Sequence, residues 1–148
     1  WGQFHLYEER TEELQELLHD AEEAFLGFDC ISPLKALLGE PFRRVEHRLS
    51  AAVRARYGVE DWDPEAYSRH KAADVLAAAS EAVHCVGWSR EEVGKVLGIR
   101  VDPLDDDPLH PLYGDDPWKP WPAVTAAARF LERLQSTVMA CMATVAES

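Results

Sequence analysis

The sequence LLHDAEEAFLGFD, residues 17–29, carries a helix-forming pattern that ends near a glycine. Apolar side chains recur every three or four positions, which is the spacing of one face of an amphipathic α-helix. They are Leu14, Leu17, Leu18, Ala21 and Phe25. Gly27 follows where a helix C-terminus favours a residue without a Cβ. We therefore predict a helix from about Glu9 to Leu26 that includes a histidine followed directly by an aspartate.

The next segment predicts a short helix and a long one, separated by turn residues. Ser32 and Pro33 are typical of a helix start, and Gly39 and Pro41 are typical of a stop. The amphipathic run FRRVEHRLSAAVRARYG follows and ends at Gly58. This stretch therefore predicts a helical turn, a break and a second helix.

Three more helices are expected downstream. They are an Ala-rich helix from Pro64 to about Val86, a shorter helix capped by Ser89, and a last helix after Pro122. The sequence has no alternating pattern typical of strands. We predict an all-α fold, a compact bundle of five or six helices that forms a single domain over residues 1–148.

The segment between the last two predicted helices, residues 101–122, is rich in proline and aspartate. Such a sequence predicts an extended connection, and its larger apolar side chains are expected to pin it to the domain surface: Leu112, Tyr113, Trp118 and Trp121. In the last helix, Val124, Leu131, Leu134 and Val138 share the spacing of a helix–helix seam. This seam packs on the core, on another subunit, or on both, and we predict a homo-oligomer.

Charge and composition exclude several classes of partner. Fifteen basic against 27 acidic residues give a formal net charge of −12, which repels phosphate backbones and anionic membranes. No stretch reaches the ~18 apolar residues of a membrane span. The three cysteines are far apart and form no CxxC pair, which fits a reducing compartment. We expect a cytoplasmic protein with no nucleic-acid polymer and no membrane as partner.

The adjacent His19 and Asp20 have two interpretations. Neighbours on a helix diverge by about 100°, yet both side chains can reach one ion at their shared flank, and Glu23 lies one turn further on. That set provides an imidazole, a carboxylate and a second carboxylate beside an activated water. Alternatively, His19 and Glu23 lie opposite the leucine stripe, with Glu12 and Glu16, on a solvated face.

The wider sequence resembles the HD-domain phosphohydrolases. The resemblance rests on LLHDAEEAFLGFDCISPLKALLG, then FRRVEHRLSAAVRARYGV, then KAADVLAAASEA. It is closest to the small bacterial and phage 5'-deoxynucleotidases and deoxynucleoside triphosphate triphosphohydrolases. It implies a divalent metal ion (Co, Mn, Zn or Mg) held by His19, Asp20 and Asp74, with Glu23 handling the proton of the attacking water.

The same resemblance implies residues that contact a deoxynucleotide substrate, either a mono- or a triphosphate. Lys35 is similar to a phosphate-contacting lysine, and Trp1 to an aromatic residue that stacks on the base. Asp29 corresponds to an aspartate after a glycine, although one extra residue makes Phe28 compete with Asp29 for that position.

The resemblance also implies another histidine ligand on a preceding helix, and the upstream histidine here is His5. His5 is too far along the chain to meet His19. Either the protein is a metal-poor relative, or the natural chain has a further segment between Tyr7 and Glu8.

Two other functions compete with this hydrolase. One is a non-catalytic HD-fold module that binds a nucleotide or a partner. The other is an all-α nucleotide pyrophosphatase, suggested by the glutamates at positions 8, 9, 12 and 13, although its second motif, ExxD, is absent from the following predicted helix.

Overall fold

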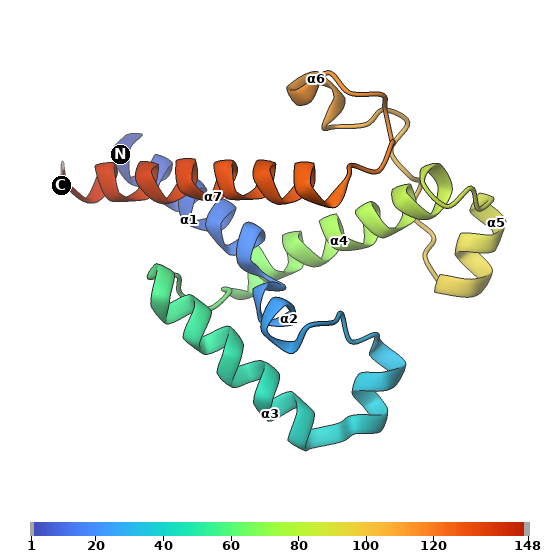
Figure 1. Cartoon of the computed structure of the whole chain (residues 1–148), viewed down its shortest axis with the longest axis horizontal. Helices are drawn as coiled ribbons and strands as arrows, with labels where there is room; N and C mark the ends of the chain where they lie inside the picture. The colour runs from blue at the N-terminus through green and yellow to red at the C-terminus, as the bar shows by residue number, and fades with distance from the viewer. Residues whose placement is uncertain (1, 147–148) are drawn as a thin grey trace. The chain divides into compact units, whose positions relative to one another are not determined.

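The computed structural model describes residues 2–146, and the side chains of residues 10–31 and 33–143. The described residues form helices and connecting loops without strands, so the predicted all-α class is confirmed (Figure 1). The chain divides into two compact units. The first contains the residues up to Trp62 and those from Ala127 onward, and the second contains Asp63–Ala126. The prediction of a single domain stays a prediction. Among the described residues, no helix is long and apolar enough to cross a membrane.

The helix predicted from about Glu9 to Leu26 is two helices, α1 (Gly2–Leu18) and α2 (Ala21–Leu26). The chain turns between them at His19 and Asp20. His19 Nδ1 lies 2.7 Å from the carbonyl oxygen of Glu16, the acceptor that Asp20 N–H would use in a continuous helix. The histidine side chain therefore competes with the backbone ladder at the point where the ladder ends.

Helix α3 (Ser32–Tyr57) contains the short and the long helix that the sequence predicts, with a kink between them. Gly39 adopts φ 66° and ψ −153° at the kink, a conformation that only glycine adopts readily, and Pro41 follows. The helix ends at Gly58, as predicted.

The core of the first unit is small and comes from three helices and the loop after α3. It consists of Leu14 and Leu18 of α1, Val53 of α3, Val59, and Leu134 of α7 (Ala123–Ala146). Two polar contacts tie α1 to α7: Arg10 Nη1 donates to the Ala140 carbonyl at 2.9 Å, and Arg133 pairs with Glu13. The predicted seam of α7 is thus divided, because Leu134 is buried and Leu131 is exposed.

The different burial of Leu134 and Leu131 predicts different effects of their substitution on stability. Leu134 is 8% exposed, so Leu134→Ala is expected to lower the free energy of unfolding by about 2–4 kcal/mol through lost burial and a residual cavity. Leu131 is 53% exposed on the same helix, so Leu131→Ala should change the free energy of unfolding by less than about 1 kcal/mol. Urea denaturation followed by circular dichroism measures both. Equal losses in the two variants would mean that Leu131 is buried against a partner.

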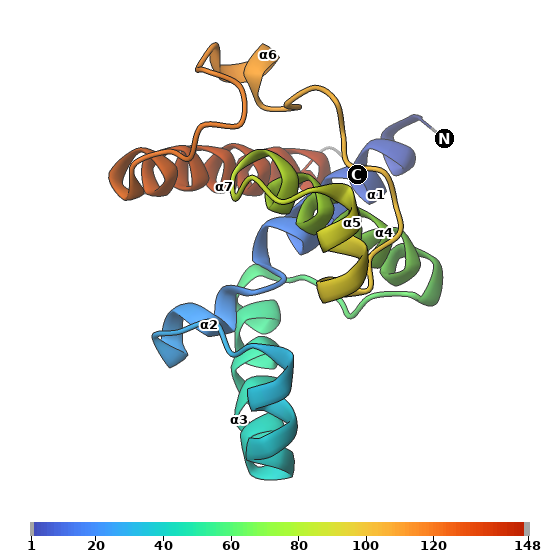
Figure 2. The same cartoon turned by 90° about the vertical axis from the view of Figure 1, so that its right-hand side faces the viewer.

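The second unit is built on α4 (Pro64–His84), with α5 (Arg90–Glu92), the π-helical turn η1 (Val93–Leu97) and α6 (His110–Tyr113). The Asp63 side chain caps α4, and Ser89 and Glu92 form a capping box on α5, as Ser89 predicted. Figure 2 shows η1 beside the C-terminal half of α4. Ala79, Ala82 and Val93 form the buried core of this unit.

Candidate functional site

His19 and Asp20 lie in the turn between α1 and α2, and their side chains face each other. His19 Nε2 is 2.8 Å from Asp20 Oδ2. If Nδ1 carries the proton donated to the Glu16 carbonyl, a neutral ring has its lone pair on Nε2, next to the carboxylate. Two acceptors this close need a cation between them, either a proton or a metal ion. The turn therefore places an imidazole nitrogen and a carboxylate oxygen side by side at the end of α1.

Glu23 lies one turn further on, where α2 packs against α3. Lys35 Nζ, from the first turns of α3, is 2.9 Å from Glu46 Oε1 and 3.9 Å from Glu23 Oε1. The Glu23 and Glu46 side chains are only 19% and 15% exposed. Glu23 is therefore not on a solvated face. The helix break turns α2 away from the direction of α1, and α3 covers the Glu23 side chain.

The surroundings of Lys35 contain more carboxyl groups than positive charges. Burial raises the pKa of Glu23, and the neighbouring carboxyl groups of Asp20 and Asp29 raise it further, partly through a hydrogen bond between Asp29 and Glu23. Burial also raises the pKa of Glu22, whose Oε2 is buried without a hydrogen-bond partner in the described structure. The hydrogen bond to Glu46 raises the pKa of Lys35 and keeps it charged. Several desolvated carboxyl groups thus share one lysine, and further positive charge would stabilise them.

Asp29 interacts with Glu23. The Phe28 ring packs against Phe42, with 6.3 Å between the ring centroids. Cys30 follows and is buried, and this burial raises the pKa of its thiol, which disfavours the reactive thiolate.

The other predicted site residues lie elsewhere in the chain. Asp74 is on α4 in the second unit, where its carboxylate is 3.0 Å from Lys71 Nζ. His5 lies on α1 fourteen residues before His19, which corresponds to about 21 Å along a continuous helix. Trp1 lies outside the described residues. The first unit therefore brings together His19, Asp20, Glu23, Asp29 and Lys35.

The sequence interpretation missed Glu46, the closest partner of Lys35. A signal for it exists, because Phe42, Glu46, Leu49 and Val53 follow steps of four, three and four. A carboxylate in such an apolar stripe is expected to turn inward and to need a partner.

Comparisons with known proteins give one informative similarity. No family model and no solved structure matches the chain. An uncharacterized protein of Rhodobacter capsulatus is 40% identical over 92 residues, which cover 62% of this chain and 46% of that protein. The chain thus matches less than half the length of this relative, whose description assigns it no activity.

Proposed function

We propose that the protein is a metal-dependent phosphohydrolase that releases a deoxynucleoside, with phosphate or triphosphate, from a deoxynucleotide. The observation that supports it best is the approach of His19 Nε2 to Asp20 Oδ2, at 2.8 Å, next to the desolvated Glu23. The donor set suits a borderline-hard divalent ion, since imidazole nitrogen and carboxylate oxygen are common ligands of Zn, Mn and Co. His19 and Asp20 would hold that ion, and the sequence resemblance adds Asp74 as the third ligand.

A bound divalent ion would supply Lewis-acid activation of the attacking water and offset phosphate charge. Glu23 would accept the proton of that water on a carboxylate oxygen, a role that its raised pKa suits because the acid dissociates nearer to neutral pH. Asp29 would orient Glu23 through their shared hydrogen bond. These roles assign the proton transfer to groups of the first unit.

Lys35 would provide local positive charge for a substrate phosphate in a protein of net charge −12. Its ammonium has three N–H donors, and Glu46 accepts from it at 2.9 Å. Glu46 would therefore position the lysine while other donors contact phosphate oxygens. A small-molecule substrate, a cytoplasmic location and a homo-oligomeric state belong to the same proposal.

The test is a product assay on the full chain with Mg, Mn, Co or Zn added in turn. We expect release of a deoxynucleoside from at least one deoxynucleoside mono- or triphosphate, and no release in the presence of a chelator. Chromatography of the products separates the alternatives. Pyrophosphate plus a monophosphate would indicate a pyrophosphatase, and nucleotide binding without turnover in any metal would indicate the non-catalytic module.

A further inference from the structure

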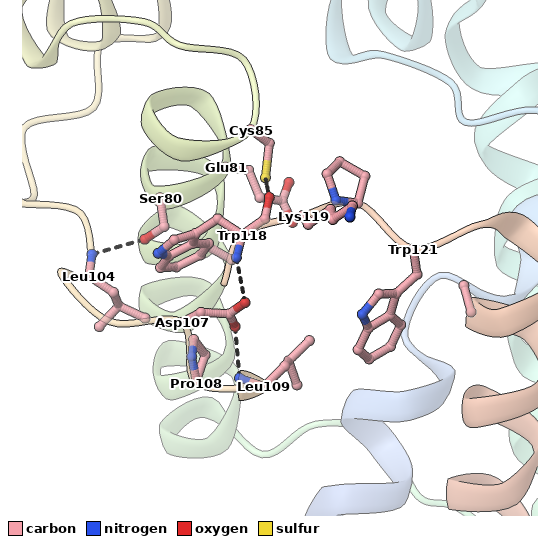
Figure 3. A pocket seen from close by; sticks show the side chains of 13 residues that line it. Ser80, Glu81, Cys85, Leu104, Asp107, Pro108, Leu109, Trp118, Lys119 and Trp121 are labelled. Carbon is pink, nitrogen blue, oxygen red and sulfur yellow. Dashed lines mark hydrogen bonds between the residues drawn. The ribbon is translucent and has the colours of Figure 1, made fainter. Parts of the chain in front are cut away.

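The second unit contains a pocket that the proposed phosphohydrolase site does not use. Its volume is about 460 Å³, within the range of small-molecule sites. One wall is the C-terminal half of α4, with Ser80 and Glu81, and the C-cap residue Cys85. The opposite wall is the proline-rich loop, with Leu109, Trp118 and Trp121. Figure 3 shows the two indoles on different sides of the opening, with Leu109 toward one end and Lys119 toward the other.

Hydrogen bonds hold the loop wall on α4. Ser80 Oγ accepts from Leu104 N–H at 3.0 Å, and His84 Nε2 lies 2.7 Å from the Leu104 carbonyl. Asp107 accepts from the backbone N–H of Leu109 at 2.8 Å and of Trp118 at 2.7 Å (Figure 3). The loop that the sequence predicts to be pinned is therefore fixed, and it forms one wall of a preformed site.

Both tryptophans are held in defined orientations. Trp118 has φ 58°, a left-handed conformation that is rare and strained for a bulky residue. Its ring stacks on His84 with 4.3 Å between centroids and 10° between planes, and its carbonyl accepts from Cys85 Sγ at 3.4 Å. Trp121 meets the Tyr113 ring edge to face, with centroids 5.0 Å apart. A strained residue that its surroundings hold in place is typical of binding sites.

The polar groups of the pocket limit what it binds. Each carboxylate oxygen of Asp107 accepts a hydrogen bond from a backbone N–H, and Lys119 is paired with Asp116 at 2.9 Å. Glu81 also lines the pocket, and its carboxylate has no hydrogen-bond or ion-pair partner in the described part of the chain. A carboxylate that lines the same pocket as two indoles favours a planar ligand with N–H donors, and it disfavours anions.

We propose that this pocket binds a planar nitrogen heterocycle that carries an amino group, with its ring against the indoles and its amino group donating to Glu81. This chemistry is that of adenine and cytosine. All the residues involved lie in the second unit, so the inference does not rest on the proposed phosphohydrolase activity.

The test is calorimetric titration of the full chain with deoxyadenosine and deoxycytidine, compared with thymidine, which lacks the amino group, and with choline. We expect the amino-bearing nucleosides to bind about tenfold more tightly than thymidine. Trp121→Ala should lower the affinity for the amino-bearing nucleosides by about tenfold or more, because a stacking surface is lost. Glu81→Gln should remove most of the preference over thymidine. Glu65→Gln, at an exposed position near the start of the same helix, is the matched control and should change nothing.

Glu81 is exposed, so Glu81→Gln keeps the test decisive even where Trp121→Ala fails to fold. Three results would overturn the proposal: no binding of either amino-bearing nucleoside, equal preference in wild type and Glu81→Gln, or binding of choline in place of the nucleosides. The last would identify a cage for quaternary ammonium groups. Because the readout is binding, loss of hydrolysis alone leaves this result unchanged.

Discussion

Glu23→Gln is expected to lower the turnover of a deoxynucleotide by about 10²-fold or more, while metal content and nucleotide affinity stay near those of the wild type. Glutamine keeps the shape of the side chain and its packing between α2 and α3, but its amide cannot accept a proton at neutral pH. The substitution removes the negative charge that lies 3.9 Å from Lys35 Nζ, but Lys35 keeps its closer partner, Glu46. The variant therefore isolates proton transfer from folding.

The pH profile gives this prediction a second readout. A base must be ionised, so the rate falls as the pH decreases through the pKa of Glu23. Burial and the carboxyl groups of Asp20 and Asp29 raise that pKa. The acid limb of kcat/KM should thus lie at higher pH than an ordinary glutamate would give, and Asp29→Asn should move it because the hydrogen bond between the two carboxyl groups changes.

Glu40→Gln is the matched control, since Glu40 is an exposed glutamate of α3 in the same unit. It should leave both turnover and the acid limb unchanged. Wild-type turnover in Glu23→Gln would remove the catalytic role, and a loss of metal in that variant would make Glu23 a ligand instead.

Much of the helical architecture followed from local signals. The kink at Gly39, the stop at Gly58 and the cap at Ser89 are where the sequence predicts them, because positive φ angles and capping hydrogen bonds are local properties. The break at His19 was missed. At this break the His19 ring lies 2.7 Å from the Glu16 carbonyl, while the apolar spacing of the sequence continues across it without interruption.

The candidate site was only partly predictable for a related reason. The pattern around residues 17–35 indicated which side chains carry chemistry, but the burial of Glu23 and the pairing of Lys35 with Glu46 depend on how α2 packs on α3. The pocket beside Trp118 gave no sequence signal beyond pinned aromatic residues, since its shape arises from hydrogen bonds that cross from the loop to α4.

His19→Ala is expected to abolish stoichiometric metal binding and to reduce hydrolysis to background. The variant removes the nitrogen ligand and leaves only carboxylates, Asp20 and the implied Asp74, which we expect to bind a transition metal too weakly at micromolar concentration. It also removes the side chain that contacts the Glu16 carbonyl, a change at a partly exposed turn that should leave helicity intact. Plasma emission spectrometry of the dialysed full chain measures the metal, and circular dichroism measures the helicity.

Asp74→Ala tests the third ligand that the sequence resemblance implies. Asp74 pairs with Lys71 on the surface of α4, so its loss costs little stability, and any loss of metal reports coordination. His47→Ala and Asp106→Ala, at exposed positions of the first and second units, should keep the metal. Wild-type metal content in both His19→Ala and Asp74→Ala would refute the assigned ligands. Loss in His19→Ala alone would place the site within the first unit, where Asp20, Glu22 and Glu23 provide the remaining carboxylates.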